Sequence, residues 1–108
     1  MESLIEWLPR TVPEQTRTSI VHGDYRVDNM IFAPGTEPRV LAVLDWELCT
    51  LGDPIADLTY YLMSWVTEPE GRSGVMGLTG PDTGIPHLEE MLERYCARTG
   101  RDGVPQLD

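Results

Sequence analysis

Two carboxylates and one amide flank a predicted β-hairpin in this 108-residue chain. Asn29 comes just before the first expected strand, Asp45 follows the second, and Asp24 lies on the loop that leads into the hairpin. Since the open ends of two antiparallel strands lie next to each other, we expect the three side chains to converge. Converging carboxylates repel each other unless a cation lies between them. Oxygen ligands of this kind are typical of Mg²⁺, which keeps phosphate and water in its coordination shell.

The strands that must position these residues are short. A β-prone run over residues 19–21 leads into the Gly-containing break before Asp24, and the hairpin strands are expected over residues 30–33 and 40–44. The second hairpin strand is a continuous apolar run, which indicates burial on both faces. A loop over residues 45–52 is expected to follow it.

Three helices are expected, over residues 2–8, over residues 54–66, and from about residue 86 to the residue before Gly100. Pro9 is expected to end the first helix. Asp53 and Pro54 are typical of a helix start, with Asp as the N-cap and Pro at the first helical position. Residues 67–85 are rich in Gly, Pro, Thr and Ser and indicate a long loop.

The order and spacing of these motifs resemble those of known phosphotransferases. The segment HGDYRVDN, residues 22–29, resembles the HGDxxxxN catalytic loop of the aminoglycoside phosphotransferase and choline kinase families, which parallels the HRDxxxxN loop of protein kinases. LDWE at residues 44–47 and LGDPIADL at residues 51–58 are similar to the metal-binding segment and the helix start that follow in those families. The resemblance spans residues 19–66 and is strongest to the kinase-like subgroup found beside, or fused to, acyl-CoA dehydrogenases.

The resemblance implies roles for four residues. Asp24 would be the catalytic base, which accepts or orients the proton of the substrate hydroxyl. Asn29 and Asp45 would hold Mg²⁺ against the phosphates of ATP. Arg26 would contact the transferred phosphate.

Three further residues would support the site. His22 would brace the catalytic loop, and Glu47 would face the substrate or assist the metal, with a solvated Glu47 as the alternative. Asp57 lies on an otherwise apolar helix, where a charge is costly without partners. The resemblance implies that Asp57 accepts hydrogen bonds from backbone N–H groups of the catalytic loop. The alternative is an exposed polar face that Asp57 shares with Tyr60 and Ser64.

The three central residues also have purely structural alternatives. Asp24 could be a turn residue, Asn29 a cap at a strand edge, and Asp45 the N-cap of a short turn. A metal-dependent hydrolase would use similar oxygen ligands, but it usually needs more ligands or His. The two histidines, His22 and His87, lie in unsuitable contexts for that chemistry.

The predicted fold is α+β and corresponds to the C-terminal lobe of a protein-kinase-like fold. We expect one partial phosphotransferase domain over residues 1–108, with a catalytic core at 19–66 and a loop and helix at 67–108. No glycine-rich phosphate loop precedes Asp24, so the N-terminal lobe is expected to be absent. The implied activity is ATP- and Mg²⁺-dependent phosphoryl transfer to a hydroxyl of a small molecule, weak or missing in this chain alone. The alternative is a non-catalytic kinase-like remnant that acts as a scaffold or interaction module.

Composition limits the partners. The net charge of −10 argues against nucleic acid and against an anionic membrane surface. The first ten residues lack the pattern of a signal peptide, and the two cysteines form no disulfide framework, which favours the cytoplasm.

The expected partners are a nucleotide and a hydroxylated small molecule. A separate N-terminal lobe or a second copy is expected to cover exposed apolar surface.

Overall fold

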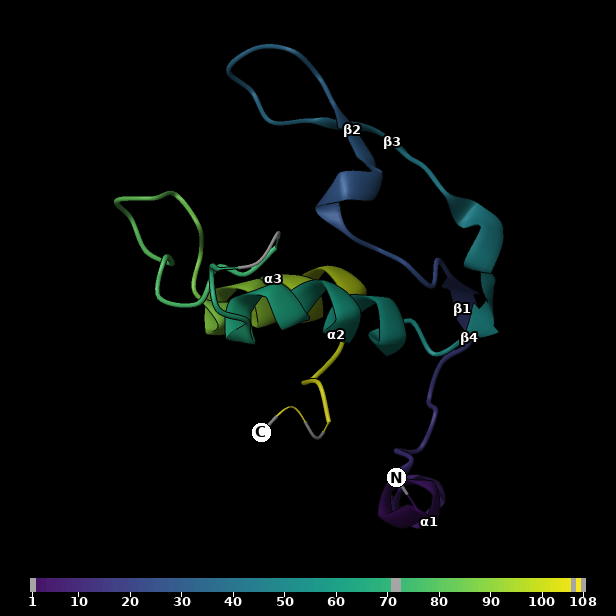
Figure 1. The fold of residues 1–108 in the computed structure, drawn as a ribbon. Helices are drawn as coiled ribbons and strands as arrows, with labels where there is room; N and C mark the ends of the chain where they lie inside the picture. The colour runs from purple at the N-terminus through teal and green to yellow at the C-terminus, as the bar shows by residue number, and fades with distance from the viewer. Residues whose placement is uncertain (1, 71–72, 106, 108) are drawn as a thin grey trace.

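The computed structural model describes residues 2–70, 73–105 and 107 as an α+β arrangement of short elements (Figure 1). Helices and strands follow in the order α1 (Glu2–Thr11), β1 (Ser19–Val21), β2 (Met30–Phe32), β3 (Val40–Val43), β4 (Thr50–Gly52), α2 (Ile55–Leu62) and α3 (Leu88–Thr99). Short 3₁₀ helices are η1 (Val27–Asn29), η2 (Trp46–Leu48) and η3 (Met63–Val66). The β2–β3 hairpin projects at the top of Figure 1, and α1 lies at the bottom.

Two antiparallel strand pairs form. The hairpin pairs β2 with β3 as predicted, with Met30 opposite Val43. The second pair joins β1 to β4, with Val21 opposite Thr50. Strand β4 lies inside the stretch 45–52, so the prediction of a loop there was wrong. A three-residue strand has no alternating pattern to detect, and its pairing with β1 decides its conformation.

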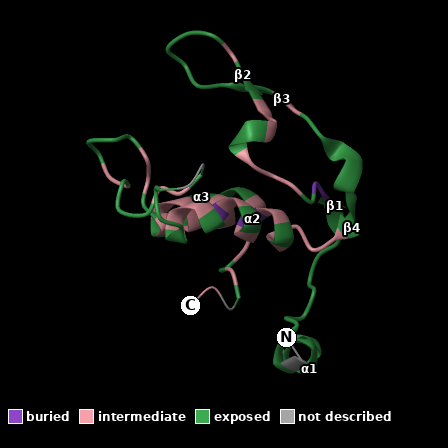
Figure 2. Cartoon of the chain, viewed as in Figure 1, coloured by how far each residue is buried: buried purple, intermediate pink, exposed green. Residues whose placement is uncertain are grey.

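The prediction that β3 is buried on both faces was also wrong. Val40 and Leu41 are 46% and 52% exposed, and the paired strand β2 exposes Ile31 and Phe32 to a similar degree. An apolar run shows what a strand is able to bury, but burial also requires a second layer against it. The described residues leave this hairpin open to solvent on much of its surface (Figure 2).

The buried core is small and lies at β1 and α2. It comprises Val21 from β1 and Leu58 and Leu62 from α2, together with the imidazole of His22. Leu58 and Leu62 are one helical turn apart and therefore lie on the same face of α2. The radius of gyration is 15.6 Å, compared with about 13 Å for a compact domain of similar length. The projecting hairpin and α1 account for this open shape.

Helix α1 continues through Pro9 to Thr11, so the prediction that Pro9 ends it was wrong. The fixed φ of proline is compatible with a helix, and its missing N–H removes one hydrogen bond, that to the carbonyl of Ile5, near the exposed C-terminal end. Two side chains bond to carbonyls in this last part of the helix. Arg10 Nε donates to the carbonyl of Glu6 at 2.8 Å, and Thr11 Oγ1 donates to that of Trp7 at 3.1 Å.

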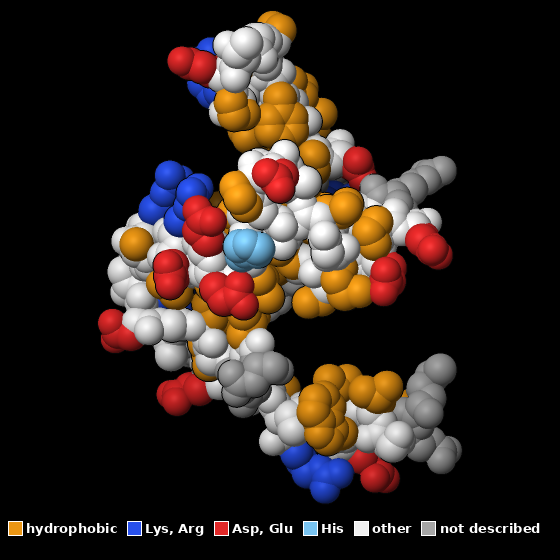
Figure 3. All heavy atoms as spheres, turned by 90° about the vertical axis from the view of Figure 1, so that its left-hand side faces the viewer, with side chains coloured by type: hydrophobic (Ala, Val, Ile, Leu, Met, Phe, Trp, Pro, Cys, Tyr) orange, Lys and Arg blue, Asp and Glu red, His pale blue; other side chains and the backbone are white. Residues whose placement is uncertain are grey.

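The apolar face of α1 is uncovered. Leu4, Ile5, Trp7 and Leu8 each expose more than half of their surface. Figure 3 shows the helix as a separate arm below the body of the molecule, with hydrophobic side chains on it. An amphipathic helix in this state has an apolar stripe suited to packing against another surface.

Helix α2 begins at Ile55, one residue after the predicted start. Asp53 Oδ1 accepts a hydrogen bond from the backbone N–H of Ile55 at 3.0 Å, which is the capping contact expected of Asp53. The single helix predicted over residues 54–66 divides into α2 and the 3₁₀ helix η3. In the part of the chain that the structure describes, no helix is both long and apolar enough to cross a membrane.

Helix α3 ends as predicted, because Gly100 adopts the left-handed conformation with φ 64° that closes a helix. Two contacts join α3 and its flanks to α2 and η3. The Arg101 guanidinium lies 3.8 Å from the Asp53 carboxylate, and Trp65 Nε1 donates to the Pro86 carbonyl at 2.8 Å. These contacts hold the segments that flank α3 close to those that flank α2, the helix that carries Asp57.

Candidate functional site

Asp24 and Asn29 are in direct contact. Asn29 Nδ2 donates to the Asp24 backbone carbonyl and to Asp24 Oδ2, each at 2.9 Å. The loop between β1 and η1 folds back on itself to make these bonds possible. Because the amide nitrogen is directed at Asp24, Oδ1 is the atom of Asn29 suited to a cation.

The other carboxylate oxygen of Asp24 is held from α2. Tyr60 Oη donates to Asp24 Oδ1 at 2.9 Å. The Tyr60 hydroxyl and then the Asn29 amide lower the pKa of Asp24, with smaller contributions from the positive charge of Arg26 and from His22, while partial desolvation opposes them. Asp24 is therefore ionised at neutral pH and is ready to accept a hydrogen bond from a hydroxyl.

Asp57 fastens the catalytic loop to α2. Its Oδ2 accepts from the backbone N–H of His22 at 2.7 Å, and its Oδ1 accepts from that of Gly23 at 3.0 Å. These are the backbone donors expected for Asp57. Charge-assisted bonds of this kind are stronger than neutral ones, so the loop backbone is firmly placed.

Tyr60 was not among the predicted site residues and was grouped with a possible polar face of its helix. The available signal was its spacing. Tyr60 follows Asp57 by three residues on α2, so both side chains lie on the same side of the helix. A helix that fixes the loop through Asp57 therefore also directs Tyr60 at that loop.

His22 connects the loop to the segment that carries Asp45. Its imidazole is 1% exposed. Nδ1 accepts a hydrogen bond from the Asp24 backbone N–H at 3.2 Å, so the ring proton is on Nε2, which donates to the Leu44 carbonyl at 2.7 Å. The ring also contacts Trp46, with centroids 4.6 Å apart and the two ring planes tilted by 58°. This geometry suits the bracing role predicted for His22.

Asp45 lies two residues after the end of β3. The backbone N–H of Leu44 donates to the Asn29 carbonyl at 2.8 Å, which places Asp45 one residue beyond a residue paired with Asn29. Asp45 is left-handed, with φ 66° and ψ 54°, and it is the one non-glycine residue with positive φ among those described. Aspartate tolerates this conformation better than most residues. Glu47 follows on η2 and is exposed.

Arg26 forms an ion pair with Asp28, two residues further along the loop. Asp28 accepts a hydrogen bond from the guanidinium and raises the pKa of Arg26 further. Both side chains are well exposed, so the pair is weak and exchangeable. A phosphate near this loop could replace Asp28 as the partner of the guanidinium.

A close backbone contact joins the two loops of the site. Gly23 has φ +88°, and a Cβ atom at this position would lie 2.8 Å from the Leu48 carbonyl oxygen. Real Cβ atoms do not approach a carbonyl this closely, and positive φ is itself unfavourable for other residues. Glycine is therefore required for the catalytic loop to pack against η2.

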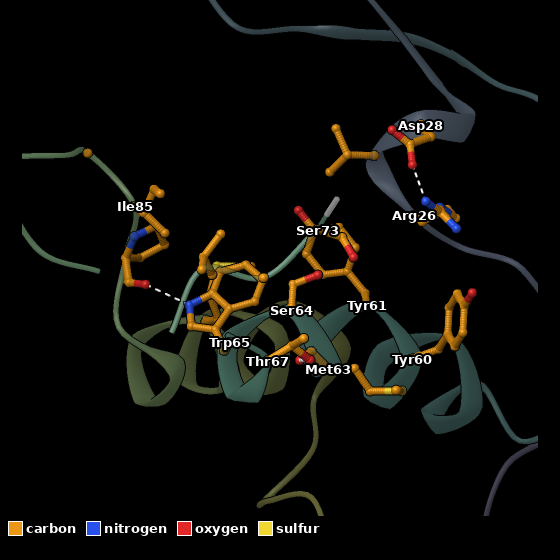
Figure 4. Close-up of a pocket in the computed structure, with 16 residues that line it drawn as sticks. Arg26, Asp28, Tyr60, Tyr61, Met63, Ser64, Trp65, Thr67, Ser73 and Ile85 are labelled. Atoms are coloured by element: carbon orange, nitrogen blue, oxygen red, sulfur yellow. Dashed lines mark hydrogen bonds and ion pairs between the residues drawn. The ribbon is translucent and has the colours of Figure 1, made fainter. Parts of the chain in front are cut away.

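A cavity of about 690 Å³ lies along α2, between the catalytic loop and the segment before α3 (Figure 4). Its aromatic walls are Tyr60, Tyr61 and Trp65, and among the described residues its charged lining consists of Arg26 and Asp28. Asp24 is not itself a lining residue, but Tyr60 both lines the cavity and bonds to the Asp24 carboxylate, so this one side chain links the two.

The donor set suits the predicted cation. The structure brings Asp24 and Asn29 together and places Asp45 next to the residue paired with Asn29. Among the described residues no group of three or more His, Cys, Asp or Glu side chains forms a metal cluster. An amide oxygen with carboxylates is the kind of set that Mg²⁺ shares with phosphate and water. The roles of these residues in metal binding and catalysis remain predictions.

The fold agrees with comparisons against known proteins. The profile of the phosphotransferase enzyme family matches residues 1–103, so the chain belongs to that family. A crystal structure from Ralstonia eutropha JMP134, of a candidate aminoglycoside phosphotransferase, is similar to this chain with a TM-score of 0.83 and 52% identity. The match covers 93% of this chain and 31% of that one, which confirms the predicted α+β fold as part of a phosphotransferase.

Curated relatives confirm the resemblance to the acyl-CoA dehydrogenase-associated subgroup. The chain is 46% identical to mouse acyl-CoA dehydrogenase family member 10 over 100% of its own length and 36% identical to human family member 11 over 96%. It is 35% identical to the probable acyl-CoA dehydrogenase IBR3 of Arabidopsis thaliana over 94%. The chain spans only 10% to 13% of the length of these relatives.

Proposed function

We propose that this chain carries the catalytic loop and metal site of an ATP- and Mg²⁺-dependent phosphotransferase that acts on a hydroxyl of a small molecule. The observation that supports this most directly is the Asp24 carboxylate. It is bonded by Asn29 on one oxygen and by Tyr60 on the other, and Tyr60 also lines a cavity large enough for a small acceptor. Membership of the phosphotransferase enzyme family supports the same reaction class.

In the proposed reaction, Asp24 is the general base. An acceptor hydroxyl in the cavity donates its hydrogen bond to the ionised carboxylate, which orients the oxygen and takes its proton as the new bond to phosphorus forms. The lowered pKa of Asp24 makes it a weak base, so its main contribution is orientation. Orientation is a large part of catalysis in phosphoryl transfer, since little covalent chemistry is left for the protein.

Asn29 and Asp45 are proposed to hold Mg²⁺ through the amide oxygen of one and the carboxylate of the other. When bound, the ion would neutralise charge on the nucleotide phosphates. The chain itself supplies rigid placement of both ligands. The Asn29 nitrogen is committed to Asp24, and the bond from His22 to the Leu44 carbonyl holds the backbone immediately before Asp45.

Arg26 is proposed to contact the transferred phosphate. Its present partner, Asp28, is 65% exposed and can turn towards solvent when a phosphate oxygen replaces it. Glu47 is exposed on η2, two residues after Asp45, where it could reach either metal or substrate through water.

The cavity is proposed to bind the acceptor. Its walls are mainly aromatic and aliphatic, and Arg26 already neutralises Asp28, so the described lining lacks the unpaired carboxylates that a polycationic compound would need. An acceptor with an apolar body and one hydroxyl fits this lining better. The acyl-CoA dehydrogenase names of the relatives suggest a hydroxylated acyl compound.

Further proposals concern partners and location. The exposed apolar side chains of α1 and of the β2–β3 hairpin are proposed to pack against an N-terminal lobe or a second copy of the chain. Cys49 and Cys96 are free thiols, which fits a cytoplasmic protein.

The test uses the full product of the gene, with ATP, Mg²⁺ and a panel of hydroxylated small molecules. Mass spectrometry should detect a phosphorylated acceptor, and Asp24→Asn should reduce the rate by about 10²- to 10⁴-fold while nucleotide binding persists. Equal rates for Asp24→Asn and the wild type would remove Asp24 from its proposed role. Failure of the wild type to bind Mg²⁺ and ATP would instead favour a non-catalytic interaction module.

A further inference from the structure

The structure assigns Tyr60 a positioning role, in which its hydroxyl locks the orientation of the Asp24 carboxylate towards an acceptor in the neighbouring cavity. This inference rests on the proposed function. Tyr60 does not transfer the proton itself. It acts through Asp24, by the 2.9 Å hydrogen bond from its hydroxyl to Oδ1.

The two oxygens of Asp24 are anchored from different elements. Asn29, at the end of η1, bonds to Oδ2, and Tyr60, on α2, bonds to Oδ1. A carboxylate anchored at one oxygen still rotates about its Cβ–Cγ bond, whereas anchors at both oxygens fix its plane. Each oxygen keeps a further lone pair, so the fixed carboxylate can still accept a bond from an acceptor hydroxyl.

Helix α2 supplies two restraints on the catalytic loop, one on its backbone and one on the Asp24 side chain. Asp57 fixes the loop backbone through His22 and Gly23, and Tyr60, one turn later, fixes the Asp24 side chain. A helix is more precise than a loop for holding a reactive group. The base therefore takes its geometry from α2 rather than from the loop alone.

Tyr60 is also part of the wall that an acceptor would meet. Its ring lines the cavity and points up from α2 towards the Arg26 side of the site (Figure 4). The side chain is 40% exposed, so its ring contributes little to the core. Replacement by Phe should thus remove the hydroxyl with a small effect on folding.

The test compares Tyr60→Phe with Tyr95→Phe in the full gene product. Tyr95 is the control because it is a tyrosine on α3 that lies outside the cavity lining. We expect Tyr60→Phe to lower kcat by about 10- to 100-fold, with the KM for ATP changed less than twofold, since a misoriented base affects mainly the transition state. Its melting temperature should match that of Tyr95→Phe.

A second comparison separates positioning from a merely structural role. In an Asp24→Asn background, Tyr60→Phe should cause no further loss of the residual rate, because the residue acts through Asp24. Replacement of Tyr60 by 4-aminophenylalanine, which keeps a donor at the same place, should restore most of kcat.

Three results would overturn the assignment. An active wild type with the same kcat for Tyr60→Phe and Tyr95→Phe would remove the role of Tyr60 and leave the proposed function intact. An equal fold-loss in the wild-type and Asp24→Asn backgrounds would show that Tyr60 acts independently of Asp24. A wild-type protein that transfers no phosphoryl group would overturn the proposed function together with this role.

Discussion

His22 Nε2 donates a 2.7 Å hydrogen bond to the carbonyl oxygen of Leu44, and this buried bond joins the loop of the proposed base to the strand end of the proposed metal ligand. The same imidazole accepts from the Asp24 backbone N–H. One side chain therefore relates the position of Asp24 to that of Asp45. The imidazole acts here as a structural bridge and needs no proton exchange.

Replacement of His22 by Phe should destabilise the protein. An aromatic ring is kept, but the Leu44 carbonyl and the Asp24 N–H lose their partner in a partly buried place, which costs up to about 1–3 kcal/mol each when no water replaces it. Urea unfolding followed by circular dichroism would measure the loss. His87→Phe, at an exposed histidine, is the control and should change the free energy of unfolding much less. Equal losses in the two variants would contradict the bridging role.

Asp57→Asn should loosen the catalytic loop. The amide keeps one acceptor oxygen but turns its NH₂ group towards a backbone donor, so one of the bonds to His22 and Gly23 is lost. We expect faster hydrogen exchange at the Gly23 or His22 amide and a loss of about 1–3 kcal/mol in stability. Exchange followed by NMR, with Asp82→Asn at an exposed loop position as control, would measure it. Unchanged protection from hydrogen exchange at both amides would contradict the role of Asp57 in holding the loop.

Two substitutions at Asp45 separate charge from backbone conformation. Asn tolerates the left-handed conformation of Asp45, whereas Ala adds strain of about 1 kcal/mol or more. Both should weaken Mg²⁺-dependent nucleotide binding, and Asp45→Ala should also lower the melting temperature. Isothermal titration of ATP at several Mg²⁺ concentrations, alongside thermal unfolding, would measure the two effects. Undiminished Mg²⁺ dependence in Asp45→Asn would exclude the carboxylate as a ligand.

Filling the cavity should impair acceptor binding alone. Ser64→Leu adds apolar volume to the cavity lining and should raise the KM for the acceptor by about tenfold, with the KM for ATP unchanged. Ala97→Leu introduces the same side chain at an exposed position of α3 and serves as the control. Steady-state kinetics with each substrate varied in turn would measure both constants. A Ser64→Leu effect confined to ATP would place the acceptor elsewhere.

Alkaline pH should destabilise the fold through Tyr61. Burial raises the pKa of Tyr61, with a smaller contribution from Tyr25, so the folded state keeps this proton to higher pH than the unfolded state does. Its contribution to stability is full below the unfolded pKa of about 10 and is lost as pH rises through the folded pKa. Between neutral pH and about pH 12, the free energy of unfolding should fall less steeply with pH in Tyr61→Phe than in the wild type. Parallel curves for the two proteins would contradict this.

The sequence allowed prediction of the parts that local patterns encode. The hairpin, the Asp53 cap and the glycine end of α3 follow from turn and capping chemistry, and the contacts of Asp57 follow from its place in a motif. Strand β4 could not be predicted, because its conformation depends on pairing with β1 rather than on its own residues. Exposure of the hairpin strands could not be predicted either, since burial depends on what lies against a strand.

The role of Tyr60 escaped prediction for a similar reason. A tyrosine on an apolar helix has no local feature that distinguishes a wall residue from one bonded to the carboxylate of a proposed base. Only the return of the chain, which carries α2 back against the loop of Asp24, brings the hydroxyl to that carboxylate. Motifs identify the residues of a site that lie close together in sequence, and folding adds those that do not.

Gly23 and Leu48 bring the two loops of the site into close backbone contact, with no room for a side chain between them. Any displacement of η2, for example by a ligand that pulls on the segment around Asp45, must be passed on to the backbone next to Asp24. The proposed metal ligand, Asp45, and the proposed base, Asp24, should therefore move together. Nucleotide binding at Asp45 is then expected to align Asp24 as well.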